Sequence, residues 1–592
     1  MMSGPYVWGR WLTWFLAAVA ATSAGLVVYT LSAQGPSVRD RAPSDLVPLA
    51  QVRVPEPPDL DRFVRDRTAA VQLGKALFWD VQVGSDGNQA CASCHFAAGA
   101  DRRTKNTLHP GTDGVFQVGG PNATLAPADF PFTRHAEPGD PQSPIVADRD
   151  DIVGSQGVTR SGFDGIVPGS SEDLRHPVPD PLFHVQGKNV RQVTGRNAPS
   201  AINAVFNFHN FWDGRANNTF NGVTPFGPGD SGARIWWALD GQLRQVTVEI
   251  TSASLASQAV GPPLSDVEMS AAGRTFPDVG KKLLSPELVP LGRQEVHPED
   301  NVLGPLARSR EEPGAGGLRV SYADLVRQAF LPQYWSAQQP ITLDGNQYSH
   351  MEANFPLFFG LAVQLYETTL VSDQTPFDLF LGGDADALTP QQRDGFEVFT
   401  GEGRCSQCHR GTLLTEATSG SRGGFSGFFN IGVRPTQEDL GAGPIAEDTG
   451  LNGAFKTPGL RNVELTGPYF HNGGKATLRQ VVDFYNRGGD FANQENKDSQ
   501  IRSLGLTEGQ RSALVAFLLS LTDERVRWQR APFDHPELCL ANGHEGGPAD
   551  VEEHPPGSGV AKDALACIPA VGAGGAKQPL EPFLGLDPAL PE

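Results

Sequence analysis

The strongest hydrophobic feature of the chain is an uncharged run close to its first residue. Residues 11–33 read WLTWFLAAVAATSAGLVVYTLSA and follow Arg10. A helix of this length spans a bilayer. The run is long for the apolar part of a signal peptide, and neither Ala24 nor Ala33 ends a clean small-x-small cleavage site. We therefore favour an uncleaved signal anchor over a cleaved signal peptide for residues 1–35. Both interpretations predict a periplasmic or extracytoplasmic protein.

A second pattern predicts an amphipathic helix that begins after Ala476. Thr477 is a good N-cap, and Gln480 three residues later completes a capping box. Gly488 is a plausible end of the helix. The apolar residues whose spacing puts them on one face are Leu478, Val481, Val482 and, at the far end, Tyr485.

The composition indicates a large, loop-rich protein with more than one domain. A chain of 592 residues is too long for one ordinary domain. Gly 68 and Pro 48 are both high counts, which predicts many loops. Segment 36–60 is rich in Pro, Asp and Arg and is predicted to be a linker. The net charge of -20 argues against nucleic acid as a partner.

A five-residue pattern occurs twice, as CASCH at 91–95 and as CSQCH at 405–409. C-x-x-C-H is the attachment signature of c-type haem, in which two thiols bind the haem vinyl groups and the histidine ligates the iron. A zinc site would need two such pairs close together, and a thioredoxin-like site would need a βαβ context that is not evident. We therefore predict two covalently bound haem c groups, with proximal ligands His95 and His409. The thiols that would attach them are Cys91, Cys94, Cys405 and Cys408.

The two remaining cysteines, Cys539 and Cys567, lie in a segment rich in Gly and Pro. Outside the cytoplasm, a disulfide between them is the natural prediction. We expect this disulfide to be structural.

Several blocks of sequence around these motifs resemble the bacterial dihaem cytochrome c peroxidases and their relative MauG. The blocks follow the order of that family and cover roughly half of the chain, so family-level expectations apply to them. The blocks are LGKALF (73–78), GRNAP (195–199), FWDGRA (211–216), GPP to VEM (261–269), PFD to CH (376–409) and FKTPGLRNVELTGPYFHNGGKATLRQVVDFYNRGG (455–489). The remainder reads as insertions, mainly 111–189, 221–255 and 271–347.

The resemblance implies a mainly α fold with two cytochrome-c-like haem domains and long loop-rich insertions. We expect an N-terminal, peroxidatic haem domain at 61–345 and a C-terminal, electron-transfer haem domain at 346–535. Residues 536–592 are then a C-terminal extension.

The resemblance also assigns residues to the N-terminal haem. Glu268 matches the acid–base residue of the family, and a carboxylate there can move a proton between the oxygens of a peroxide. Gln258 matches a distal amide, and Trp212 matches the tryptophan between the haems that relays electrons. Without the resemblance, Glu268 would be read as a solvated carboxylate, Gln258 as a surface amide and Trp212 as a core aromatic.

At the C-terminal haem, the resemblance makes Tyr485 an iron ligand. The peroxidases have Met at this position and MauG has Tyr. Phenolate is a hard anionic donor that stabilises ferric iron. From spacing alone, Tyr485 would be a core tyrosine of its helix. Met351 is a weaker candidate, and His471 matches a histidine of the family close to this haem.

Asn197, Thr466 and Pro468 match positions that bind calcium between the two haem domains. Amide and carbonyl oxygens are the hard donors that calcium prefers. The alternative is that Asn197 and Pro468 only form turns.

His109 is a candidate for the sixth ligand of the N-terminal haem. Many peroxidases have a second histidine shortly after the first motif that leaves the iron on activation, whereas MauG leaves the site open. The intervening sequence FAAGADRRTKNTL departs from the peroxidase pattern, and a surface histidine is the alternative.

The resemblance thus implies a dihaem c-type peroxidase. It would reduce hydrogen peroxide to water at the N-terminal haem with electrons relayed from the C-terminal haem. The electron donor would be a small cytochrome c or cupredoxin, or an oxidisable protein, and residues 11–33 would anchor the chain to the membrane. The alternatives are a MauG-like oxidase of a partner protein, a RoxA-like dioxygenase that cleaves polyisoprene, and a non-enzymatic electron-transfer cytochrome with two inert haems.

Overall fold

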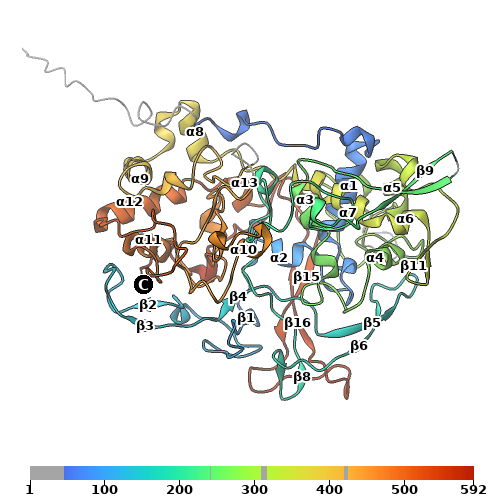
Figure 1. Cartoon of the computed structure of the whole chain (residues 1–592), viewed down its shortest axis with the longest axis horizontal. Helices are drawn as coiled ribbons and strands as arrows, with labels where there is room; N and C mark the ends of the chain where they lie inside the picture. Colours follow the sequence, from blue (N-terminus) through green and yellow to red (C-terminus); the bar gives the residue numbers. More distant parts are fainter. Residues whose placement is uncertain (1–45, 241, 309–315, 419–423, 592) are drawn as a thin grey trace, which may run out of the picture. The chain divides into compact units, whose positions relative to one another are not determined.

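Each C-x-x-C-H motif follows a helix that crosses a second helix at a glycine. Figure 1 shows the chain as a computed structural model, which describes residues 46–240, 242–308, 316–418 and 424–591. Helix α1 (Arg67–Trp79) packs on α7 (Phe355–Glu367). A Cβ atom on Gly74 would lie 1.9 Å from the carbonyl oxygen of Ala362, so any larger residue would separate the two helices.

The second motif repeats this plan. Helix α9 (Pro390–Thr400) packs on α12 (Glu508–Leu519). A Cβ atom on Gly395 would lie 1.9 Å from the carbonyl oxygen of Ala513. The sequence before each motif therefore specifies a close helix crossing that supports the C-x-x-C-H loop.

The remaining helices are mostly short. They are α2 (Ala92–His95), α3 (Ser254–Ala259), α4 (Phe276–Leu283), α5 (Tyr322–Ala329), α6 (His350–Ala353), α8 (Pro376–Gly382), α10 (Gly443–Ala446), α11 (Leu478–Arg487) and α13 (Glu524–Arg527). Single 3₁₀ turns connect many of them.

All sheets formed by the described residues are antiparallel strand pairs. Most of these pairs lie in the predicted insertions. The pairs are β1 (Leu108–His109) with β4 (Ile152–Val153), β2 (Arg134–His135) with β3 (Ile145–Ala147), β5 (Ser161–Gly165) with β6 (Leu174–Pro177), β7 (His184–Val185) with β8 (Lys188–Asn189), β9 (Ile235–Leu239) with β10 (Gln242–Val246), β11 (Ile341–Leu343) with β12 (Asn346–Tyr348), β13 (Phe428–Phe429) with β14 (Phe455–Lys456), and β15 (Leu538–His544) with β16 (Asp563–Ile568).

The expectation of a mainly α fold is not confirmed. Helices account for 27% of the structure and strands for 16%. Loops and turns make up the remainder, because the insertions are rich in Gly and Pro and form short hairpins instead of helices.

The main hydrophobic core crosses the domain boundary that we predicted at residue 345. This core contains Phe78 of α1, Phe359 of α7 and Leu538 of β15. Residues on both sides of 345, and part of the predicted C-terminal extension, therefore bury their apolar side chains together.

The C-terminal hairpin β15–β16 carries the predicted disulfide, and Cys539 is bonded to Cys567. The hairpin also holds the two segments that flank the first insertion. Arg103 Nη1 donates to the carbonyl oxygen of Ala541, and Arg191 forms an ion pair with Asp563. The extension is therefore part of the N-terminal half of the fold.

No helix in the described part of the chain is long and apolar enough to cross a membrane. The predicted signal anchor at 11–33 lies outside the described residues.

Candidate functional site

The first motif presents His95 with its Nδ1 atom fixed by a backbone carbonyl. His95 ends helix α2, and its Nδ1 atom lies 2.8 Å from the carbonyl oxygen of Gly99. A carbonyl oxygen only accepts, so Nδ1 carries the hydrogen and Nε2 keeps a lone pair. This is the usual arrangement of a metal-binding histidine, whose outer nitrogen donates to a carbonyl.

The second motif repeats this geometry. Its thiols lie on a 3₁₀ turn (Cys405–Gln407), and the Nδ1 atom of His409 lies 2.9 Å from the carbonyl oxygen of Leu414. The cysteines of both motifs are free thiols, and burial raises their pKa values. Across the described ranges, no group of three or more His, Cys, Asp or Glu side chains is arranged to hold a metal ion. These features fit haem attachment better than a disulfide or a zinc site.

A cavity of about 500 Å³ opens above the first motif, which we call the first cavity. Its volume lies within the range of roughly 300–1,000 Å³ typical of cofactor sites. Several residues that the sequence singled out line this cavity together: Cys91, Cys94, His95, Asn197, Trp212, Gln258 and Glu268. Two thiols, an imidazole and enough space suit a covalently bound haem.

Glu268 lies on a turn that a glycine of the first insertion holds in place. A Cβ atom on Gly157 would lie 1.8 Å from the carbonyl oxygen of Val267, so only glycine lets the two segments approach this closely. Burial raises the pKa of Glu268, and the positive charge of Arg215 only partly offsets that rise. A carboxyl group with a raised pKa holds and releases a proton more readily near neutral pH.

Gln258 lies on helix α3 and also reaches the first cavity. Its side-chain amide forms no hydrogen bond with another described residue. The amide and the Glu268 carboxyl group are therefore both free to contact a small polar molecule in the cavity.

Trp212 follows Phe211, which has a left-handed backbone with φ of 62°. The indole Nε1 atom donates to the carbonyl oxygen of Asn197 over 2.8 Å. The ring meets His471 edge-on with 6.3 Å between centroids. Trp212 therefore lies in the wall between the two motifs, in a fixed orientation.

A second cavity, of about 160 Å³, opens beside the second motif. The predicted ligands Cys405, Cys408, His409 and Tyr485 line it, as does His471. His471 is stacked on Phe455 with 3.7 Å between ring centroids, and burial lowers its pKa to about 4. His409 and Tyr485, the two predicted iron ligands of this haem, thus line one cavity with the thiols of the second motif.

Helix α11 positions Tyr485 largely as predicted. Thr477 is the N-cap and accepts from the backbone of Gln480, and Gly488 ends the helix with φ of 91°. The predicted capping box is wrong in one detail, because the Gln480 side chain accepts from Ala476 and not from Thr477. Burial, together with the neighbouring thiols, raises the pKa of Tyr485 well above the ordinary tyrosine value.

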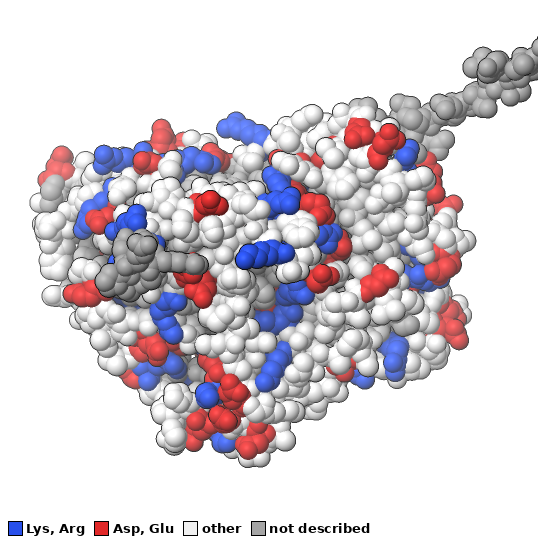
Figure 2. All heavy atoms as spheres, turned by 180° about the vertical axis from the view of Figure 1, so that it is seen from behind, with Lys and Arg blue, Asp and Glu red and all other residues white. Residues whose placement is uncertain are grey.

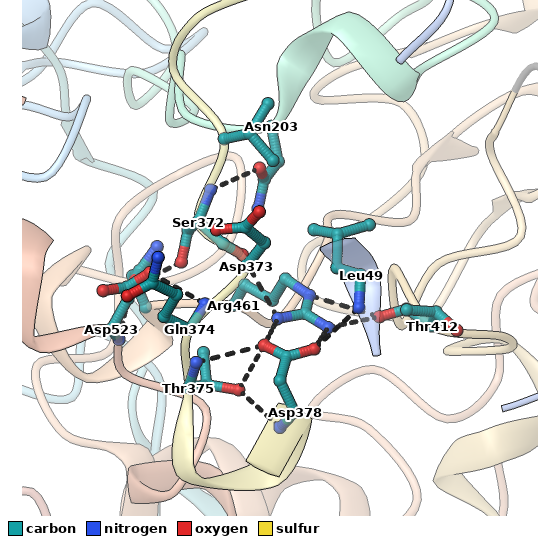
Figure 3. Close-up of polar contacts among 12 residues, drawn as sticks. Leu49, Asn203, Ser372, Asp373, Gln374, Thr375, Asp378, Thr412, Arg461 and Asp523 are labelled. Carbon is teal, nitrogen blue, oxygen red and sulfur yellow. Dashed lines mark hydrogen bonds and ion pairs between the residues drawn. The ribbon is translucent and has the colours of Figure 1, made fainter. Parts of the chain in front are cut away.

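A buried ion pair fixes the loop that follows the second motif. Figure 3 shows Arg461 and Asp378 facing each other, and their bonds are 2.6 and 2.8 Å long. Arg461 also donates to the carbonyl oxygen of Thr412, three residues after His409. Asp378 accepts from the backbone of Leu49. The pair thus joins the linker, α8 and the block at 455–489.

The predicted calcium ligands meet in a third, intermediate cavity. Asn197, Thr466 and Pro468 all line this space of about 120 Å³. Among the described residues, none donates a hydrogen bond to the side-chain oxygen of Asn197. These three residues offer amide, hydroxyl and carbonyl oxygens, the donor types that calcium prefers, whereas the basic residues Lys456 and Arg461 also line this cavity.

His109 does not reach the first cavity. It lies on strand β1, paired with Ile152, and its ring packs against Phe183. His109 is not among the described residues that line the first cavity. Met351 is buried in the main core and lines neither motif cavity.

Two charged residues of these cavities were not singled out from the sequence. Glu367 ends the apolar helix α7, lines the first cavity, and has a pKa that burial raises to about 8. Lys456 lies within the block FKTP and lines all three cavities. In the sequence, Glu367 could have been noticed as a single charge at the end of an apolar run. Lys456 could have been noticed as a single charge within an otherwise apolar motif.

Known proteins support the resemblance. A family model described as di-haem cytochrome c peroxidase matches residues 68–138 and 169–296. Cytochrome-c peroxidase IdrP2 of Denitromonas iodatirespirans is 38% identical over 183 residues, which are 27% of this chain and 47% of the relative. Methylamine utilization protein MauG of Methylorubrum extorquens is 32% identical over 205 residues, which are 34% of this chain and 50% of the relative.

Among solved structures, a MauG-like protein associated with microbial copper homeostasis is 19% identical, with a TM-score of 0.43. The match covers 83% of this chain and 97% of that protein. The chain spans about half the length of the two curated relatives. The chain is therefore similar to the di-haem cytochrome c peroxidases and MauG over these matched parts of its length.

Proposed function

We propose that this protein is a dihaem c-type peroxidase that reduces hydrogen peroxide to water. Cys91, Cys94 and His95 would hold the peroxidatic haem, and the second motif would hold the haem that supplies electrons. The observation that carries the proposal is that Glu268 and Gln258 line the same cavity as His95 and the two thiols of its motif. An electron carrier with two inert haems has no use for this acid and amide.

In the first cavity, one residue would bind the peroxide and another would transfer its proton. When bound, haem c supplies the iron that exchanges electrons with peroxide. Gln258 offers a donor and an acceptor that orient the peroxide. Glu268 takes the proton from one peroxide oxygen and returns it to the other, and its raised pKa favours both steps near neutral pH.

Trp212 would carry electrons between the two sites. It lines both motif cavities, and its hydrogen bond to Asn197 keeps the indole ring in one orientation. An aromatic ring held between two redox centres shortens each electron-transfer step.

A MauG-like oxidase of a partner protein is the second candidate function. Tyr485 favours it, because an anionic phenolate ligand keeps iron oxidised more strongly than a methionine does. The position of Tyr485 in the lining of the second cavity supports ligation.

The proposed partners are hydrogen peroxide and a small redox protein, either a cytochrome c or a cupredoxin, outside the cytoplasm. On the face in Figure 2, acidic and basic side chains of the described residues are interspersed. A donor would therefore be recognised there by a local arrangement of charges. The anchoring of the chain to the membrane by residues 11–33 remains part of this proposal.

We also propose that Asn197, Thr466 and Pro468 bind calcium. A ligand that binds only the folded protein stabilises it by about 2.7 kcal/mol at a free concentration one hundred times its Kd. Chelation with EGTA is therefore expected to lower the thermal unfolding midpoint of the haem-loaded protein, and added calcium should restore it. Calorimetry checks this, with magnesium as the ion control and Asn197→Ala as the variant that should not respond. An unchanged midpoint after chelation contradicts the site.

Low-temperature electron paramagnetic resonance, followed by a peroxide consumption assay, tests the proposed function. In the air-oxidised protein, we expect a high-spin signal from the N-terminal haem and a low-spin signal from the C-terminal haem. Peroxide should change the high-spin signal, and a reduced small cytochrome should be oxidised as peroxide is consumed. Two low-spin signals that ignore peroxide, even after one-electron reduction, would leave an electron-transfer cytochrome.

A further inference from the structure

Among the residues that the structure describes, two line both motif cavities, Trp212 and Lys456. Both also line the intermediate cavity. They are joined directly, because the backbone nitrogen of Lys456 donates to the carbonyl oxygen of Trp212 over 2.9 Å. The wall between the two proposed haem sites therefore consists of an aromatic ring and a lysine.

Lys456 is buried and has no charged partner in the described part of the protein. Its side chain is 5% exposed, and strand β14 holds its backbone against β13. Its ammonium group forms no hydrogen bond or ion pair with a described residue. Burial lowers its pKa to about 8, and no carboxylate offsets that effect. A buried ammonium group without an anion is costly, and such groups are normally paired.

Two of the carboxylates that line the first cavity with Lys456 already have basic partners. Asp439 forms an ion pair with Arg196 over 2.7 Å. Asp213 binds both Arg196 and Arg215. The other two, Glu268 and Glu367, have pKa values that burial raises, and neither offsets the burial of Lys456. An anion that completes the Lys456 site is then one that a molecule in the cavities supplies.

We propose that Lys456 is a positioning residue that pairs with a propionate carboxylate of a bound haem at the junction of the two cavities. This inference rests on the proposed haem occupancy. A haem c keeps its two propionates free because its vinyl groups bind the cysteines, so a carboxylate is available on the group that the first and second motifs hold. The paired lysine would fix the orientation of the haem edge against Trp212.

The charge of Lys456 has a consequence that can be measured. A cation beside a haem disfavours the ferric state, which carries one more positive charge than the ferrous state. Removal of the charge by Lys456→Met should therefore lower the reduction potential of the adjacent haem. We expect on the order of a tenfold shift in the ratio of oxidised to reduced haem at a fixed applied potential, which is 59 mV for one electron.

The experiment is a spectroelectrochemical titration of both haems in the intact, haem-loaded protein. Three variants are compared with the natural chain: Lys456→Met, Lys456→Arg, which keeps the charge, and Lys562→Met, which removes an exposed lysine of the C-terminal hairpin. Haem content and absorbance are measured first. We expect a lowered potential in Lys456→Met, rescue in Lys456→Arg and no change in Lys562→Met. Equal potentials in all four proteins would overturn the proposal.

A second arm identifies the source of the anion. The titration is repeated in buffer without small anions and with added phosphate. A reduction potential that does not change with phosphate supports a haem propionate as the partner of Lys456. A reduction potential that changes with phosphate only in proteins that keep Lys456 assigns the site to a free anion and overturns the propionate assignment. Peroxide turnover is measured separately. If Lys456→Met shows the lowered potential but the natural chain does not turn over peroxide, the peroxidase function is refuted and this inference stands.

Discussion

Replacement of Glu268 by glutamine is expected to lower kcat/KM for hydrogen peroxide by about 10²- to 10⁴-fold, the usual contribution of a positioned acid–base group. Glutamine keeps the shape of the side chain but cannot accept and return a proton. Burial already raises the pKa of Glu268, which suits it to proton exchange near neutral pH. Steady-state oxidation of a reduced small cytochrome at varied peroxide concentrations measures the effect.

Glu367→Gln is the matched control, because Glu367 is the second buried glutamate of the first cavity. Its pKa of about 8 keeps it mostly protonated at pH 7, so glutamine resembles the form that is already present. We expect a much smaller effect on kcat/KM than that of Glu268→Gln. Both variants must retain two haems. Full activity in Glu268→Gln together with a large loss in Glu367→Gln would transfer the acid–base role to Glu367.

The chemistry of the attachment sites was predictable because it depends on local sequence. The spacing of C-x-x-C-H sets the positions of two thiols and one imidazole within a single turn, whatever surrounds them. The same holds for the helix that carries Tyr485, because Thr477 and Gly488 determine its ends. The disulfide Cys539–Cys567 followed from the count of cysteines and the expected compartment.

The remaining features depend on contacts between distant segments, which a pattern along the chain does not contain. Strand pairs in the insertions form between short segments whose register is set by tertiary packing. Helix α7 joins the core of α1 because Gly74 allows the two backbones to touch. The role of Lys456 could not be predicted for the same reason. In the sequence it is one residue of an apolar motif, and its position between the two cavities becomes evident only in the fold.

The choice between a peroxidase and a MauG-like oxidase depends on Tyr485. A peroxidase must accept electrons at its second haem from a small protein donor, which is easier when the potential of that haem is high. A phenolate ligand lowers this potential and so favours the storage of oxidising equivalents. The proposed ligand Tyr485 in the second cavity is therefore the residue that separates the two candidate functions.

Tyr485→Met is accordingly expected to raise the reduction potential of the C-terminal haem by a few hundred millivolts, a part of the range of roughly 0.8 V that axial ligands span. A neutral thioether stabilises ferric iron less than an anionic phenolate does. Spectroelectrochemical titration measures the shift, and electron paramagnetic resonance shows whether the low-spin signal changes. Tyr469→Phe is the control, because Tyr469 lines the same cavity but donates its hydroxyl to the carbonyl oxygen of Val463. An unchanged potential in Tyr485→Met would mean that Tyr485 is a core tyrosine, and a donor-dependent peroxidase would then be the better description of the protein.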